Sequence, residues 1–147
     1  MSQTIKAVII KPNCIPEPIY IENDIMALSK EVNIDSNGNL HSEFEPFEII
    51  EIKDDVHIIS SPKGAERGLP ITRTIGRHIK LYGIIYIVKM QTFDLISMDK
   101  HEVIDYCIKF LDDTIPLERF GLPSVDNAYD NNNTTLRGHL EITCDDW

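Results

Sequence analysis

The chain has 147 residues, the length of a single domain. Hydrophobic residues make up 42% of it and charged residues 26%. This composition excludes wholesale disorder and argues against a membrane protein. Its 24 acidic side chains outnumber its 14 Lys and Arg side chains, so the formal net charge is -10. A strongly acidic chain repels phosphate groups, and this argues against direct binding to nucleic acid or to an anionic membrane surface.

The cysteines and the apolar segments predict a compartment. Cys14, Cys107 and Cys144 are odd in number and widely spaced, with no CxxC pair, a pattern typical of reduced thiols rather than of a disulfide framework. No apolar run reaches the roughly 20 residues that span a bilayer. The apolar stretch Ala7–Ile10 is too short for the core of a signal peptide. We therefore expect a cytoplasmic protein.

The first third of the chain predicts two strands and a helix. The branched residues of Ile5–Lys11 predict a buried strand, and residues 19–21 predict a second one after a proline-rich loop. Asn23 or Asp24 can cap the helix that follows. The apolar stripe of this helix repeats at i, i+3 and i+7, at Ile25, Leu28 and Val32.

The middle of the chain predicts hairpins. Phe47–Ile52 and Val56–Ser60 flank a tight connection, as the two strands of a hairpin do. Leu81–Lys89 is the most apolar strand candidate and is interrupted by Gly83, and Thr92–Met98 would be its antiparallel neighbour.

A second helix begins at Asp99, because Glu102 stands three residues later, as in a capping box. Its apolar stripe is predicted to consist of Val103, Ile104, Cys107, Ile108 and Leu111. Farther on, the polar residues 126–135 are typical of a mobile loop, and Leu140–Cys144 predicts a short strand. Trp147 would pack against the body of the protein, since a Trp side chain offers about 150–250 Å² to bury.

Helices that interrupt a series of hairpin-connected strands are typical of an α+β domain. We predict a single small domain with a mainly antiparallel sheet and two or three helices, in the order β-β-α-β-β-(basic segment)-β-β-α-tail. This α+β domain would occupy residues 1–113. Residues 114–147 would form an acidic, partly low-complexity extension that packs on the domain at its end.

Two neighbouring stretches carry a family resemblance: Gly68-Leu69-Pro70-Ile71-Thr72-Arg73, and the apolar strand at 82–88 with its internal Gly83. They resemble domain-of-unknown-function family 3846, small proteins of bacteria, phages and other mobile elements, in which a Gly-x-Pro-Asn-Arg-like turn precedes such a strand. The resemblance covers roughly residues 5–98 and includes the opening strand, its proline loop and the short helix. Thr72 departs from the pattern, which often has Asn there, and the C-terminal third has no counterpart. The resemblance implies a phage or mobile-element protein acting in the host cytoplasm, and it brings no activity with it.

Basic residues concentrate in residues 61–80, where five Lys or Arg side chains and one Glu give a local charge of +4. A strand from Pro70 to Lys80 would mix isoleucines and arginines on one face, whereas a helix would separate them. Pro70 suits the first position of a helix, although Gly76 and the β-branched residues make this helix weak. We therefore predict a helix over 70–80.

Three interpretations of this basic segment stay open. It is a strip neutralised by the acidic surface, a mobile loop without a role, or an anion site. In an anion site, Arg forks would hold a nucleotide-like molecule by its phosphates, and Tyr82 or Tyr86 would stack on its base. Arg73→Ala should then abolish binding and leave the melting temperature within a few degrees. The residues of this site would be Arg67, Arg73, Arg77, His78, Lys80 and Tyr82.

Common catalytic motifs are absent from the sequence. There is no GxSxG, GxxxxGKS or GxGxxG motif, and no cofactor is implied. His101 and Asp105 would share a helix face as metal ligands do, but no third ligand is identifiable and Glu102 is explained as a capping residue. We therefore predict no metal site.

The sequence thus favours a non-catalytic protein that binds a component of a host system, such as an antiviral defence, and so interferes with it. An acidic surface suits a basic channel on a partner protein. The alternatives are a binder of a nucleotide-like anion at the basic segment and an enzyme of unrecognised type. The oligomeric state and the strand order are not predicted.

Overall fold

The computed structural model of the protein describes residues 4–34, 38, 46–53, 55–92, 94–120 and 141–143. The predicted loop at 126–135, Cys144 and Trp147 lie outside the described residues. The elements in chain order are β1 (Thr4–Ile10), β2 (Glu17–Glu22), α1 (Ile25–Glu31), β3 (Glu48–Lys53), β4 (Val56–Ser60), β5 (Ile71–Ile75), β6 (Ile79–Tyr82), β7 (Ile85–Gln91), β8 (Asp94–Ile96), α2 (Lys100–Lys109), β9 (Thr114–Ile115), the 3-10 helix η1 (Leu117–Phe120) and β10 (Glu141–Thr143).

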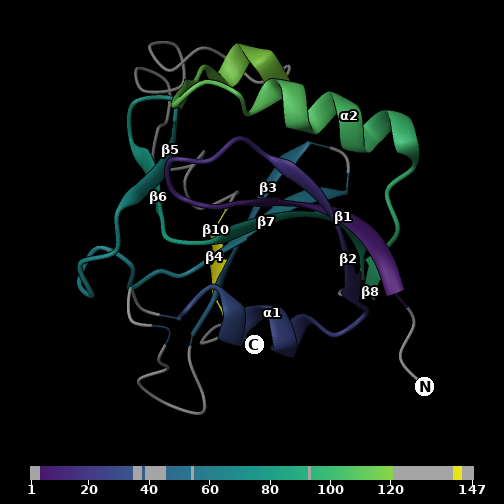
Figure 1. Ribbon diagram of the computed structural model, residues 1–147, viewed down its shortest axis with the longest axis horizontal. Helices are drawn as coiled ribbons and strands as arrows, with labels where there is room; N and C mark the ends of the chain where they lie inside the picture. The colour runs from purple at the N-terminus through teal and green to yellow at the C-terminus, as the bar shows by residue number, and fades with distance from the viewer. Residues whose placement is uncertain are drawn as a thin grey trace.

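The main sheet is antiparallel throughout its described pairs, in the strand order β10-β3-β4-β7-β1-β2, and β8 pairs with the end of β7. The prediction of an α+β fold with a mainly antiparallel sheet is therefore confirmed, and the described residues form two α-helices, where two or three helices were predicted. Strand β2 lies at one edge of this sheet. Figure 1 shows the sheet between two helices, with α2 above it and α1 below it.

Each face of the main sheet has its own hydrophobic core, because side chains alternate between the faces along each strand. Strand β7 supplies Ile85 and Ile87 to the core under α2, and Tyr86 and Val88 to the core under α1. A strand that is covered on both faces must be apolar at consecutive positions. This explains why residues 85–88 form a continuous apolar run.

A second, smaller sheet has the order β6-β5-β9 and contributes to the core under α2. The prediction of a helix over 70–80 is wrong, because β5 and β6 form an antiparallel hairpin there. The prediction assumed that successive side chains of a strand alternate regularly between its two faces. A register shift between Ile71 and Arg73 interrupts this alternation. Gly76 lies in the turn with φ 62°, and the β-branched residues favour the strand.

Gly83 divides the stretch Leu81–Lys89, which was predicted as one strand, into strands of two different sheets. Its φ of 73° is in the left-handed region that favours glycine. Its amide donates to the carbonyl oxygen of Pro70 at 2.9 Å, and a Cβ at this position would lie 2.8 Å from Leu69 Cδ1. The chain therefore turns out of the small sheet at Gly83 and enters the main sheet at Ile85.

Helix α2 begins with the predicted capping box. The Asp99 side chain accepts from the Glu102 amide at 2.8 Å, and the Glu102 side chain accepts from the Asp99 amide at 3.0 Å. Glu102 also binds Lys89 Nζ at 3.0 Å, and this bond raises the pKa of Lys89. The N-terminus of α2 is thus fixed both to its own first turn and to β7.

The buried face of α2 differs from the predicted stripe. Val103 packs into the core and Cys107 is half-buried against it, as predicted, but the other inward positions are the aromatic residues Tyr106 and Phe110. The remaining three members of the predicted stripe, Ile104, Ile108 and Leu111, are exposed. The aromatic side chains bury more apolar area than the isoleucines would, so the helix is rotated to place them inward.

The segment that follows α2 belongs to the same core. Strand β9 pairs in parallel with β5, and Ile115, Leu117 and Phe120 are buried in the cluster under α2. The Phe120 and Phe110 rings pack with their centroids 5.4 Å apart. Residues 114–120 are therefore part of the domain, although the predicted boundary placed them in an extension. Strand β10 adds to the edge of the main sheet beside β3.

Candidate functional site

Arg73, the central residue of the predicted anion site, is 2% exposed and uses its guanidinium within the protein. Its Nε donates to the carbonyl oxygen of Phe110 at 2.7 Å, and its two terminal nitrogens donate to the carbonyl oxygens of Thr72 and Cys14 at 2.7 and 2.9 Å. Burial lowers the pKa of Arg73, while Asp113 and Asp112 oppose this shift. Arg73 therefore connects three segments of backbone, and its assignment to a ligand is wrong.

Arg67 lies on the other side of the main sheet from Arg73. Its guanidinium donates to the side-chain oxygen of Asn33 at 3.3 Å, directly after α1. The buried Asn33 side chain also donates to the Pro46 carbonyl oxygen at 2.7 Å and accepts from the Ser61 hydroxyl at 2.6 Å. Arg67 is thus part of a polar network that anchors the basic segment to the end of α1.

The remaining predicted site residues belong to the β5–β6 hairpin. Arg77 and His78 lie in its turn and are exposed, as is Lys80 in β6. Tyr82 is half-buried at the end of β6, where its Cβ would lie 2.6 Å from a Cβ added to Gly64. The structure therefore does not bring the six predicted residues together. Anion binding at the basic segment stays a prediction.

Tyr86, the other tyrosine proposed to stack on a base, is buried under α1. Arg73 instead contacts the end of α2, on the opposite face of the sheet. The two side chains therefore cannot hold one nucleotide between them.

The described residues contain no group of three or more His, Cys, Asp or Glu side chains suited to a metal ion. Asp105, one of the weak metal candidates, instead accepts from Lys109 Nζ at 2.7 Å. Neither of the two described helices is long and apolar enough to cross a membrane.

The feature that sequence reasoning misplaced is a set of exposed apolar side chains in α2 and just beyond its C-terminal end, which we call the α2 stripe: Ile104, Ile108 and Leu111. These side chains are 48, 59 and 52% exposed. Ile104 and Ile108 are four residues apart in α2, so they lie on one side of the helix, and Leu111 follows the C-cap residue Phe110, just beyond the end of α2. The hydrophobic pattern of the sequence contained them, but it could not show which side of the helix is buried.

The α2 stripe faces away from the centre of the sheet. Glu102 binds Lys89 of β7, and Ile104 is two residues from Glu102, about 200° around the helix. Helix α2 packs over β1 and β2, and these strands follow β7 in the sheet order. The stripe therefore lies on the side of α2 that looks toward the β2 edge.

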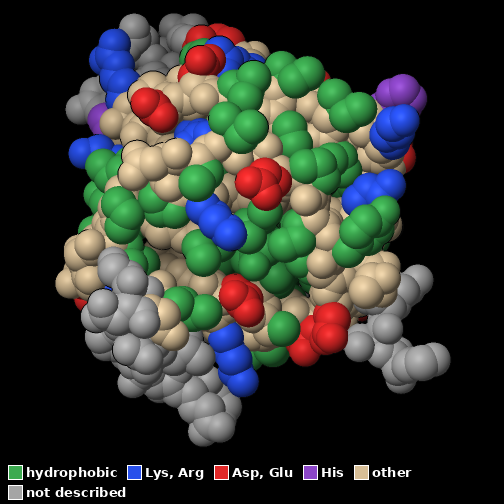
Figure 2. Space-filling view, in the orientation of Figure 1, with side chains coloured by type: hydrophobic (Ala, Val, Ile, Leu, Met, Phe, Trp, Pro, Cys, Tyr) green, Lys and Arg blue, Asp and Glu red, His purple; other side chains and the backbone are tan. Residues whose placement is uncertain are grey.

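The β2 edge carries further exposed apolar side chains. Tyr20 in β2 is 68% exposed and Ile15, in the loop before β2, is 67% exposed. Lys6 Nζ lies 5.7 Å from the centroid of the Tyr20 ring and holds it by a cation–π contact. Figure 2 shows hydrophobic side chains along α2 and over the face beneath it, with isolated charged side chains among them.

Comparisons with protein-family models, with curated proteins and with solved structures found no match to this chain. The resemblance to family 3846 therefore stays a prediction. The function has to be argued from the geometry of the surface and the charge of the chain.

Proposed function

We propose that this chain is a non-catalytic binding protein that engages a partner protein through the α2 stripe. The observation that supports this is the exposure of Ile104 and Ile108 on one flank of α2 and of Leu111 just beyond its end. Apolar anchors at i and i+4 have the spacing at which one face of a helix enters an apolar groove or packs on another helix. Scattered single apolar residues need no explanation, but an aligned set marks an interaction surface.

The charge of the chain defines the chemistry of this partner. With a net charge of -10, the protein attracts basic surfaces over a distance set by the ionic strength. The partner would therefore have an apolar centre that receives the stripe and a surrounding rim rich in Lys and Arg. The apolar contact supplies affinity, and the charge speeds association and selects the partner.

The resemblance to family 3846 supports a setting for this binding. In a phage or mobile element, a small acidic protein without catalytic motifs would act in the host cytoplasm by occupying a host component, here proposed to belong to an antiviral defence. The basic rim of that component would be the surface that otherwise binds nucleic acid.

The experiment compares three immobilised proteins in the same bacterial host lysate at low salt: wild type, Ile108→Asp and Met26→Asp. Met26 is 50% exposed on α1, so Met26→Asp makes the same change in charge and hydrophobicity on the opposite layer of the fold. Captured proteins are quantified by mass spectrometry. We expect a partner that wild type and Met26→Asp enrich equally and Ile108→Asp does not.

Raising the salt concentration should reduce this capture, because screening weakens the attraction between the acidic protein and a basic rim. Equal enrichment by all three proteins would place the interface elsewhere. If no protein is enriched by wild type, binding to a host protein is contradicted.

A further inference from the structure

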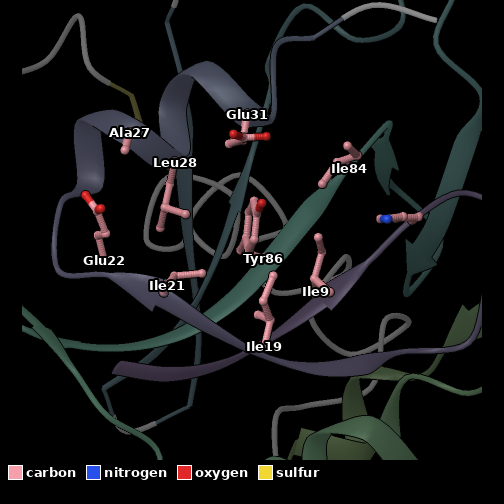
Figure 3. A pocket seen from close by; sticks show the side chains of 10 residues that line it. Ile9, Ile19, Ile21, Glu22, Ala27, Leu28, Glu31, Ile84 and Tyr86 are labelled. Atoms are coloured by element: carbon pink, nitrogen blue, oxygen red, sulfur yellow. The ribbon is translucent and has the colours of Figure 1, made fainter. Parts of the chain in front are cut away.

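A groove of about 480 Å³ lies between α1 and the main sheet at its β2 end. Its walls come from four elements or their flanks, and its lining is mainly aliphatic, from Ile9, Ile19, Ile21, Ala27, Leu28 and Ile84. Figure 3 shows these side chains converging on one space, with Tyr86 standing at its centre. Its volume is in the range of small-molecule sites.

The Tyr86 side chain is the polar centre of this groove. Its ring rises from β7 toward α1, and its hydroxyl points toward the side of α1 that carries Glu31 (Figure 3). Tyr86 is 4% exposed, and its hydroxyl has no hydrogen bond to any residue in the described part of the chain. A buried hydroxyl without a partner costs free energy. A ligand that offers a hydrogen bond at this point would remove that cost.

Carboxylates dominate the charge around the groove. Glu22 and Glu31 line it, and the one basic side chain in the lining is Lys11. The strand register pairs Glu22 with Thr4, at the start of β1, whereas Lys11 follows the end of that strand. Lys11 therefore lies at the far end of the hairpin from Glu22, and the groove has a net charge of -1 from one Lys and two Glu side chains.

Glu31 and Tyr86 are electrostatically coupled. Burial is the main cause that raises the pKa of Tyr86 to about 12, and the Glu31 carboxylate adds to it. The tyrosine is therefore neutral and offers oxygen lone pairs beside a carboxylate. Such a pair of acceptors suits a cationic donor and repels an anion.

We propose that this groove binds a small amphipathic primary amine, with its alkyl or aryl body against the aliphatic walls and its ammonium group between Glu31 and the Tyr86 oxygen. This ligand supplies the missing hydrogen bond to Tyr86 and a positive charge to match Glu31 and Glu22. The site is separate from the α2 stripe, since α1 and α2 cover opposite faces of the sheet.

The test uses three probes with the same tail and different heads: n-hexylamine, n-hexanol and n-hexanoate. Backbone amide shifts in an NMR titration would locate and quantify binding. We expect hexylamine to bind at least about tenfold more tightly than either other probe, because only its head pairs with the carboxylates. The shifts should centre on Ile19, Ala27 and Ile84.

Four variants test the contacts. Glu31→Gln should weaken hexylamine binding about tenfold and leave hexanol binding unchanged. Tyr86→Phe should weaken hexylamine binding several-fold while the ring still fills the core. Glu118→Gln removes the same charge from an exposed position on η1, at the α2 side of the sheet, and should have no effect. Ala27→Leu fills part of the groove and should weaken all three probes.

Each other outcome overturns the proposal. Equal binding of the three probes would show an apolar groove that does not recognise amines. Preference for hexanoate would assign the head-group site to Lys11. If Glu31→Gln and Glu118→Gln reduce amine binding equally, the amine is attracted to an acidic protein in general and not to this groove. If no probe binds, the groove is not a ligand site.

Discussion

Arg73 donates from Nε to the carbonyl oxygen of Phe110 at 2.7 Å, and this buried bond joins the small sheet to the end of α2. The same guanidinium reaches the carbonyl oxygen of Cys14 at 2.9 Å, in the loop between β1 and β2. One side chain thus connects the C-terminal end of α2 to β5 and to the loop between β1 and β2.

We predict that Arg73→Met is strongly destabilising. Three carbonyl oxygens would lose a charged donor inside the protein, and the expected loss in the free energy of unfolding is about 3 kcal/mol or more. Lys80→Met removes the same charge from an exposed position of β6 and should change stability by about 0.5 kcal/mol or less. Urea unfolding of both variants measures the difference. Similar stabilities for the two variants would show that Arg73 is not a structural residue.

A second prediction tests which flank of α2 is buried. Val103 is 3% exposed and its neighbour Ile104 is 48% exposed. Val103→Ala should reduce the free energy of unfolding by about 2 kcal/mol, since two buried methyl groups are lost and a cavity remains. Ile104→Ala should reduce it by about 0.5 kcal/mol or less. Because Val and Ile have similar helix propensities, the comparison isolates burial. A larger effect at Ile104 would mean that a partner or another part of the chain covers the stripe.

A third prediction concerns the packing of Tyr82, which sequence reasoning assigned to ligand stacking. A Cβ at Gly64 would lie 2.6 Å from Tyr82 Cβ, too close for either residue to remain in place. Gly64→Ala should therefore cost about 1–3 kcal/mol in unfolding free energy. Gly68→Asn is the control, because Gly68 has φ 72° and open space around it, and Asn tolerates this conformation. Both variants are compared by thermal unfolding. A lower melting temperature for Gly68→Asn than for Gly64→Ala would contradict this packing.

The features that the sequence predicted well are those set by neighbouring residues. The capping box joins Asp99 to Glu102, three positions later, and the hairpin of β3 and β4 joins adjacent segments. The role of Arg73 was missed because its partners are 37 and 59 residues away and are backbone atoms, which leave no trace in the side-chain pattern. Likewise, an apolar periodicity identifies α2 as a helix, but the competing aromatic residues decide which of its flanks is buried.

The groove was missed for a similar reason. Its lining comes from β1, β2, α1 and β7 and their flanks, and each of its aliphatic residues alone is typical of a core position. What distinguishes the groove is that the short helix α1 does not cover the β2 end of the sheet completely. A property of this kind depends on the length of one element relative to another, and no single segment of the sequence contains it.

The fourth prediction is a pH dependence of stability that arises from Tyr86. Its pKa in the folded protein is raised from an ordinary value near 10 to about 12. Below pH 10 both states keep the proton, so Tyr86 contributes its full stabilising effect there. Between pH 10 and pH 12 the unfolded chain releases the proton while the folded chain retains it, so stability falls as the pH rises.

The comparison of wild type with Tyr86→Phe isolates this effect from the titration of Lys side chains. At neutral pH the variant should be at least as stable as wild type, because the removed hydroxyl had no hydrogen-bond partner among the described residues. Between pH 10 and about 12, wild type should lose about 2–3 kcal/mol relative to the variant. Urea unfolding across this range measures both curves. Parallel curves would mean that Tyr86 titrates as it does in the unfolded chain, and its hydroxyl would then not be the buried group on which the amine-binding proposal depends.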